Sequence, residues 1–203
     1  MESKERKLVQ QCPSSFSCSN GKSPEPAGGV ERSSRTPCSM PQQWSSPSQG
    51  RIKINVDAGW SGPHSIGLGF VARDHRGIIM LAGTCLEAQR LDPLIAEAMA
   101  LRWSLHTALE VGLDSVIFEL DSLSVVKAMT TNSSLWTIQI LMQDCIYLAS
   151  LFTSISFNHV SRNANAPAHT LASLACSYNT KLWWDVPPLE IEQALFVDAA
   201  LSD

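Results

Sequence analysis

Long apolar runs are absent from this 203-residue sequence. None reaches the roughly 18 apolar residues that a transmembrane helix needs, and the longest candidate, residues 135–152, is interrupted by Gln139, Gln143 and Asp144. The opening stretch, MESKERKLVQQC, has no apolar segment of secretory length and predicts no signal peptide. These absences argue against a membrane protein and predict a location in the cytoplasm or the nucleus.

Motifs that would indicate a metal finger, a redox centre or a nucleotide-binding loop are also missing. The six cysteines form no CxxC pair and no finger-like spacing with histidines. Free thiols of this kind fit a reducing compartment. No GxGxxG or Walker loop and no serine nucleophile elbow is present, which disfavours an unrelated phosphate-binding enzyme or a serine hydrolase.

Aliphatic residues are scarce in residues 1–50, which contain twelve serines and six of the eleven prolines. Such a segment cannot bury enough apolar surface to offset the ordering of its backbone, so a disordered tail is predicted there. A folded domain is predicted over 51–186, and a short helix or tail over 187–203. Residues 51–203 contain nine Lys or Arg against fifteen Asp or Glu. A domain this acidic is no obvious nucleic-acid clamp, but it suits a site for divalent cations.

Hydrophobic periodicity predicts an α/β fold. Residues 51–59 alternate between apolar and polar side chains, as a strand does, and short gaps link them to two more strands in an antiparallel meander. After Pro93 the apolar spacing becomes three and four, predicting a helix that stops near Gly112. The later strands alternate with helices and are expected to run parallel through right-handed crossovers. Strands are predicted over 51–59, 66–74, 78–87, 115–121 and 154–160, and helices over 94–108, 122–131, 135–152 and 164–181.

Three carboxylates are not explained by packing. Asp57 and Asp121 come at the ends of the first and fourth predicted strands, where either could instead cap a turn or a helix. Glu97 falls on or beside the apolar stripe of its predicted helix, where an ionised carboxylate is costly unless it is paired or bound to a cation. The alternative for Glu97 is a place at the edge of the stripe, with its carboxylate in water.

Taken together, the three carboxylates predict a metal site. Strand ends and the first turns of a helix facing the sheet can meet in space, and a pair of divalent cations is the commonest reason for gathering charges that repel one another. Oxygen ligands favour Mg²⁺ or Mn²⁺ over zinc. Such a pair activates water and stabilises the leaving oxygen in phosphodiester cleavage.

Four segments in this order resemble the ribonuclease H-like fold, and more closely its plant retroelement-derived, reverse-transcriptase-like type. They are KINVDAG at 53–59, AEAMAL at 96–101, FELDS at 118–122 and NHVSRNANAPAHTLA at 158–172. The resemblance runs from about residue 44 to the C-terminus. It implies a five-stranded mixed sheet in the order β-β-β-α-β-α-α-β-α, and two-metal hydrolysis of the RNA strand of an RNA–DNA hybrid.

The resemblance also implies roles for particular residues. Asp57 would bridge both metals, Glu97 and Asp121 would each be ligands, and His169 occupies the position where many members carry a fourth aspartate. For His169 three interpretations stay open: a metal ligand, a proton shuttle, or a hydrogen-bond partner of Asp121 or Asp57. His159 is expected to be a surface residue of its strand.

Departures from the family pattern support an alternative function. The loop before the last helix, VSRNAN, has no histidine, and residues 132–153 contain no Lys or Arg where other members grip the hybrid. Weak hybrid affinity is therefore expected, and a monomer is predicted. The alternative is a catalytically weak or inactive module, domesticated from a retroelement, that binds nucleic acid or a protein partner.

Overall fold

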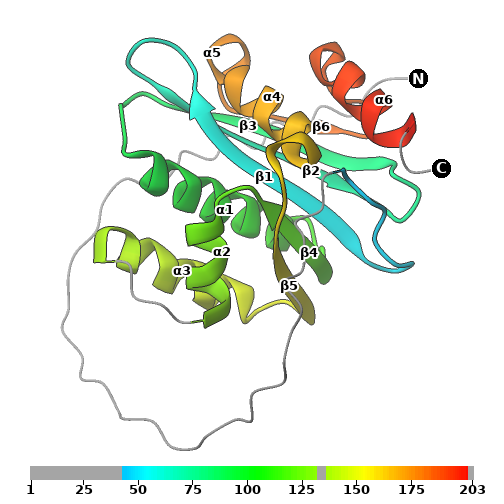
Figure 1. Cartoon of the computed structure of the whole chain (residues 1–203), viewed down its shortest axis with the longest axis horizontal. Coiled ribbons are helices and arrows are strands. Elements are labelled where there is room, and N and C mark those ends of the chain that lie inside the picture. The colour runs from blue at the N-terminus through cyan, green and yellow to red at the C-terminus, as the bar shows by residue number, and fades with distance from the viewer. Residues whose placement is uncertain (1–42, 132–135, 201–203) are drawn as a thin grey trace, which may run out of the picture. The chain divides into compact units, whose positions relative to one another are not determined.

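The computed structural model describes residues 43–131 and 136–200, which build a mixed six-stranded sheet with the strand order β5-β4-β1-β2-β3-β6 (Figure 1). Strands β1, β2 and β3 form the predicted antiparallel meander, and β4 and β5 run parallel to β1. The strands are β1 Ile52–Trp60, β2 Ile66–Arg73, β3 Ile79–Glu87, β4 Ser115–Leu120, β5 Ser154–His159 and β6 Lys181–Trp184. The α/β fold class is thereby confirmed.

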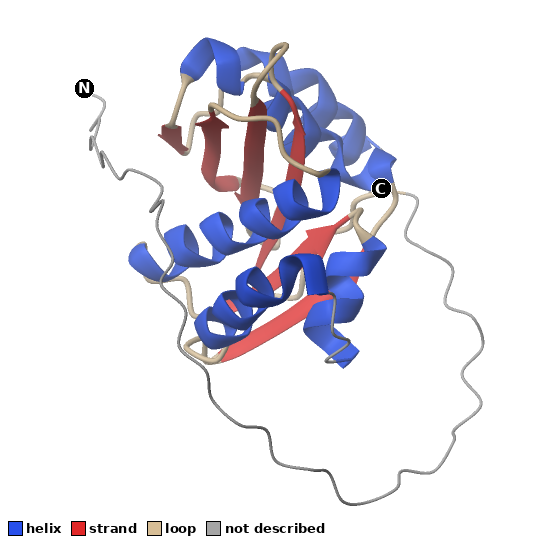
Figure 2. Ribbon diagram, turned by 90° about the vertical axis from the view of Figure 1, so that its left-hand side faces the viewer, coloured by secondary structure: helices blue, strands red, loops and turns tan. Residues whose placement is uncertain are grey.

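Helices cover both faces of the sheet (Figure 2). Helix α1 packs against β1 and β2 with α3 behind it, and α4 contacts the same two strands. Asp92 caps α1 by accepting a hydrogen bond from the backbone N–H of Leu94 at 2.9 Å. No described helix has the length and apolar character to cross a membrane. The helices are α1 Pro93–Glu110, α2 Leu123–Thr131, α3 Gln139–Ala149, α4 Ala166–Ser173, α5 Ala175–Tyr178 and α6 Glu192–Ala200, with 3₁₀ turns η1 Trp136–Ile138, η2 Arg162–Asn165 and η3 Leu189–Ile191.

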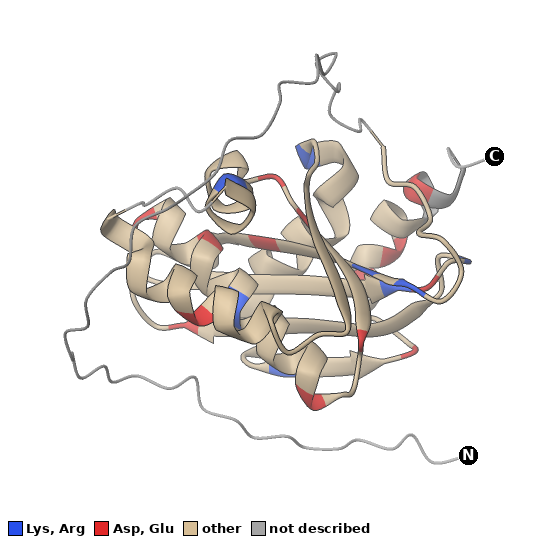
Figure 3. Cartoon of the chain, turned by 90° about the horizontal axis from the view of Figure 1, so that it is seen from below, with Lys and Arg blue, Asp and Glu red and all other residues tan. Residues whose placement is uncertain are grey.

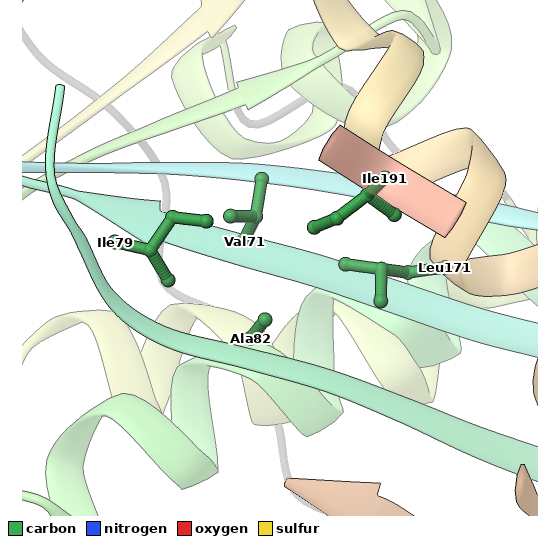
Figure 4. Packing of buried hydrophobic residues seen from close by; sticks show 5 residues of the cluster. All are labelled: Val71, Ile79, Ala82, Leu171 and Ile191. Atoms are coloured by element: carbon green, nitrogen blue, oxygen red, sulfur yellow. The ribbon is translucent and has the colours of Figure 1, made fainter. Parts of the chain in front are cut away.

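The close contact between α4 and β2 depends on two glycines. A Cβ atom at Gly67 or at Gly69 would overlap the backbone of Ala172 in α4. The absence of a side chain at both positions lets α4 approach β2 closely. Further along the same contact, Leu171 of α4 packs into a core of Val71, Ile79, Ala82 and Ile191 (Figure 4). The helix that carries His169 is therefore fixed to the sheet at short range.

The single helix predicted over 164–181 is wrong. The chain there forms η2, α4 and α5, and then β6, a sixth strand that the sequence pattern did not predict. Asn179 ends the helical stretch with a φ of 61°. Residues Lys181–Trp184 then pair antiparallel with β3 at the edge of the sheet. The helix predicted over 135–152 is shorter than expected, since α3 begins at Gln139 and ends at Ala149.

The predicted disordered tail falls mostly outside the described residues, because residues 1–42 are not described. Residues 43–50 of this predicted tail are described, and Trp44 among them is buried, at 5% exposure. Its ring lies 3.8 Å from the guanidinium carbon of Arg73. Packing therefore begins before the predicted start of the domain at Arg51.

A network of buried polar side chains crosses the sheet on the face that α4 covers. The Lys53 ammonium lies 2.8 Å from Glu119, and Asn55 donates to Glu119 at 3.0 Å. Arg73 donates to Asn55 at 2.9 Å and to Asp198 of α6 at 2.7 Å. This network, Lys53–Asn55–Arg73–Glu119–Asp198, joins β1, β2, β4 and α6.

Candidate functional site

Three carboxylates from separate elements meet at one edge of the sheet. Asp57 comes from β1, Glu97 from the second turn of α1 and Asp121 from the residue after β4. Each offers one oxygen atom, and these atoms all lie within 4.8 Å of one another. Strands β1 and β4 are parallel neighbours, so their carboxyl ends lie side by side. The predicted convergence of the three side chains is confirmed.

Asp57 sits deeper than the sequence pattern indicated. Strand β1 continues to Trp60, so Asp57 lies inside the strand opposite Gly69 and not at the strand's end. It is only 2% exposed. Burial raises the pKa of Asp57, and a hydrogen bond with His169 opposes that rise. The carboxylate therefore occupies a position that strongly disfavours an unpaired charge.

Glu97 is the most perturbed of the three. Burial raises its pKa to about 9, and the charges of Asp57 and Asp121 act in the same direction. Its Oε2 atom is buried and has no hydrogen-bond partner among the described residues. In the absence of a cation, Glu97 therefore holds a proton at neutral pH.

The donor set fits a divalent cation. An unpartnered buried carboxylate oxygen is costly unless something binds it, and here it faces two further carboxylates. All three residues offer oxygen, which Mg²⁺ and Mn²⁺ prefer. A cation would replace the proton on Glu97 and remove the repulsion within the cluster.

His169 contacts the cluster from α4. Its Nδ1 lies 2.6 Å from Oδ2 of Asp57, and its side chain is 49% exposed. The hydrogen bond with Asp57 is the largest influence on the imidazole and raises its pKa, against the effect of burial. Of the three interpretations left open by the sequence, the structure shows the hydrogen bond to Asp57. The ring's exposure leaves it accessible to solvent and to a ligand.

Two neighbours of Asp121 were not predicted as site residues. His159, expected at the strand surface, is half-buried, with its Nε2 3.0 Å from the backbone oxygen of Asp121. The Nε of Arg162 lies 3.4 Å from Oδ2 of Asp121. The parallel register that pairs Leu120 with His159 brings both side chains to this point. Register between strands that are distant in sequence leaves no local signal, so the pattern could not reveal these contacts.

Comparisons with known proteins agree with this geometry. The model of the reverse transcriptase-like family matches residues 55–175. That range includes all three carboxylates and His169. A search of curated proteins finds no match.

Solved structures of RNase H1 enzymes share the fold. The enzyme from the archaeon Halobacterium salinarum is 26% identical, with a TM-score of 0.59 over 64% of this chain and 99% of that one. LC11-RNase H1, isolated from compost, is 22% identical, with a TM-score of 0.58 over 64% of this chain and 98% of its own. Its complex with an RNA/DNA hybrid is 23% identical, with a TM-score of 0.56 over 63% and 97% of the two chains.

Proposed function

The chain belongs to the reverse transcriptase-like family, and from this premise we propose that it is a ribonuclease H-type hydrolase. Its substrate would be the RNA strand of an RNA–DNA hybrid, cleaved endonucleolytically with two divalent cations, Mg²⁺ or Mn²⁺. The observation that supports this most directly is the meeting of Asp57, Glu97 and Asp121 within 4.8 Å. Solved RNase H1 structures with the same fold, one of them holding an RNA/DNA hybrid, support the choice of substrate.

Each carboxylate has a proposed role. Asp57, held inside β1, would be the ligand shared by both cations, and Glu97 and Asp121 would each be a further ligand. When bound, the cations supply an activated water and neutralise charge on the phosphate and the leaving oxygen. Glu97 must release its proton for this set to form, because its pKa is raised to about 9 by burial.

His169 would orient Asp57 and handle a proton. Its Nδ1 lies 2.6 Å from Oδ2 of Asp57, and this hydrogen bond would fix the direction of that carboxylate. The side chain is half-exposed, and the hydrogen bond with Asp57 raises its pKa, so Nε2 could hold or deliver a proton near the leaving oxygen.

We expect the hybrid to be bound weakly by a monomer in the cytoplasm or the nucleus. Helix α3 carries no Lys or Arg, and basic residues (blue in Figure 3) occupy only a few scattered positions on the described ribbon. Phosphate contacts supply most of the affinity of proteins for nucleic acids. With few such contacts, micromolar enzyme is needed to detect turnover.

A cleavage assay on a labelled RNA–DNA hybrid, in Mg²⁺ and in Mn²⁺, tests the proposal. Wild-type protein should cut the RNA strand slowly in Mn²⁺, and Asp57→Asn and Glu97→Gln should each reduce the rate at least about 100-fold, because each removes a ligand charge. Asp144→Asn is the matched control, since Asp144 of α3 is a partly exposed carboxylate paired with Arg102 of α1. Absence of cleavage with either ion at micromolar enzyme would overturn the nuclease proposal.

A second candidate, a catalytically weak or inactive interaction module, is favoured by one surface. Ile140 and Tyr147 are exposed and lie seven residues apart on one side of α3, and the exposed Trp136 and Leu151 lie just before and just after that helix. Exposed apolar rows of this kind mark binding surfaces for proteins. On this reading Mn²⁺ would add little thermal stability, and Glu97→Gln would leave any cellular phenotype unchanged.

A further inference from the structure

Arg162 lies beside the carboxylates in a position that its contacts do not explain. It opens η2, the turn between β5 and α4, and its side chain is 76% exposed. Within the described residues its one polar partner is Asp121, with Nε 3.4 Å from Oδ2. Its charge also acts on Asp57 and His169. The guanidinium thus faces the cluster while its two terminal nitrogens have no protein partner in the described part of the chain.

A structural role does not account for this arrangement. Exposed ion pairs contribute little to stability, and this one has a single long contact. Asp121 is held in place without it, because the residue directly follows β4 and its backbone oxygen lies 3.0 Å from Nε2 of His159. Asp121 therefore does not need Arg162 to hold it in place, and most of the N–H groups of the guanidinium have no described partner.

We propose that Arg162 is a substrate-binding residue whose guanidinium contacts a backbone phosphate of the nucleic acid beside the carboxylate cluster. This inference rests on the proposed function. A guanidinium offers paired N–H groups that match two phosphate oxygens, and it stays charged at every relevant pH.

Charge around the site gives this contact its importance. The charged carboxylates of Asp57 and Asp121 repel an approaching phosphate backbone, and α3 supplies no basic side chain to offset that repulsion. Arg162 touches Asp121 through Nε alone, so its terminal nitrogens can bind a phosphate while Nε stays beside Asp121.

The test measures binding and needs no catalysis. Fluorescence anisotropy of a labelled RNA–DNA hybrid, in EDTA and over a range of salt, gives the affinity and its dependence on salt. Arg162→Gln should lower the affinity several-fold at low salt and reduce the magnitude of the salt slope by about one unit, because one phosphate contact is lost. Arg162→Lys should restore the slope, since it restores the charge.

Arg76 provides a matched control. Its Nε lies 3.3 Å from Oδ2 of Asp74, and its side chain is 67% exposed, so its ion pair resembles that of Arg162. It lies in the turn after β2, at the opposite end of the sheet from Asp57. Arg76→Gln should leave both affinity and salt slope unchanged.

The outcomes separate this inference from the proposed function. An unchanged affinity and slope in Arg162→Gln overturn the inference, as does a wild-type protein that does not bind the hybrid at low salt. A wild-type protein that binds with an Arg162-dependent slope, but cuts nothing in Mg²⁺ or Mn²⁺, supports the inference and overturns the nuclease. Cleavage that is lost in Asp57→Asn but keeps its KM and salt dependence in Arg162→Gln overturns the inference alone.

Discussion

Strand β1 carries two kinds of buried charge on one face. Lys53 and Asn55 belong to a network in which positive and negative groups alternate. Asp57, two residues further on, belongs to a cluster in which all three groups are acidic. Both regions are buried and lie on the same sheet, so the difference between them is electrostatic. The charges of the network are balanced within the protein, whereas those of the cluster repel one another unless a proton or a cation binds.

The partners of each group make this difference concrete. In the network, Arg73 bonds both Asn55 and Asp198, and Glu119 bonds both Lys53 and Asn55. In the cluster, Oε2 of Glu97 is left without a described partner, and its carboxyl group keeps a proton. Buried charges paired with charges of opposite sign serve the fold, whereas a buried cluster of like charges marks the candidate functional site.

Removing a network member gives the largest expected effect. Arg73→Met leaves the Asp198 carboxylate and the Asn55 amide oxygen without their shared donor in a buried position. We expect a loss of about 3–5 kcal/mol in the free energy of unfolding, because the substitution breaks a buried ion pair. Urea unfolding followed by circular dichroism measures it.

The control for this change is Arg76→Met, at an ion pair whose arginine is 67% exposed. It should cost less than about 1 kcal/mol. The double variant Arg73→Met/Asp198→Leu should recover much of the loss, since both charges are then gone. Equal losses in Arg73→Met and Arg76→Met would show that the network does not stabilise the fold.

The acidic cluster could be predicted from sequence, and the network could not. Asp57 and Asp121 follow strand patterns, and Glu97 interrupts a helical stripe, so each departs from a local rule. Arg73 and Asp198 are separated by 125 positions, and neither breaks a local pattern. The pairing of two charges this far apart in the sequence depends on how α6 packs near β2. Local periodicity does not predict that packing.

The elements of the fold likewise divide into those that local sequence predicts and those that depend on distant contacts. The order of elements from β1 to β5 follows from periodicity because each is long or strongly patterned. Strand β6 has only four residues and follows a run of helix-forming residues, so its own sequence does not predict a strand. It is a strand because it pairs with β3. Trp44 likewise lies in a Ser- and Pro-rich stretch, and its burial depends on Arg73, which lies elsewhere in the sequence.

A smaller perturbation should act on the cluster through α4. In Gly69→Ala the new Cβ overlaps the backbone of Ala172, so α4 must move away from β2 and carry His169 away from Asp57. We expect a cost of about 1–3 kcal/mol in the free energy of unfolding, as for other overpacked sites. Cleavage in Mn²⁺ should also fall.

Gly59→Ala is the matched control for this change. A Cβ at Gly59 would meet Ala172 and His169 only at 3.9 Å, which is ordinary van der Waals contact. Stability and cleavage should therefore remain near those of the wild type. If Gly59→Ala costs as much as Gly69→Ala, the close approach of α4 is not what positions His169.

The smallest effect, taken per pH unit, is a slope of stability against pH that belongs to the cluster alone. Without cations, folded Glu97 keeps its proton up to about pH 9, whereas the unfolded chain releases it near 4.5. The folded state thus binds more protons between these values, and its stability falls as the pH rises. Glu97→Gln should remove this contribution, which is at most about 1.4 kcal/mol per pH unit. Thermal unfolding in EDTA from pH 5 to pH 8.5 measures the difference.

Mn²⁺ should reverse the sign of this dependence. The cation and the proton compete for the same carboxyl group, so binding is stronger at pH 8 than at pH 6, and the stabilisation by Mn²⁺ grows as the pH rises. In Glu97→Gln this growth should largely disappear, because the competing proton is gone. An identical slope in wild type and Glu97→Gln, with and without Mn²⁺, would mean that Glu97 is satisfied within the protein as the network is. The contrast between the two regions of β1 would then be lost.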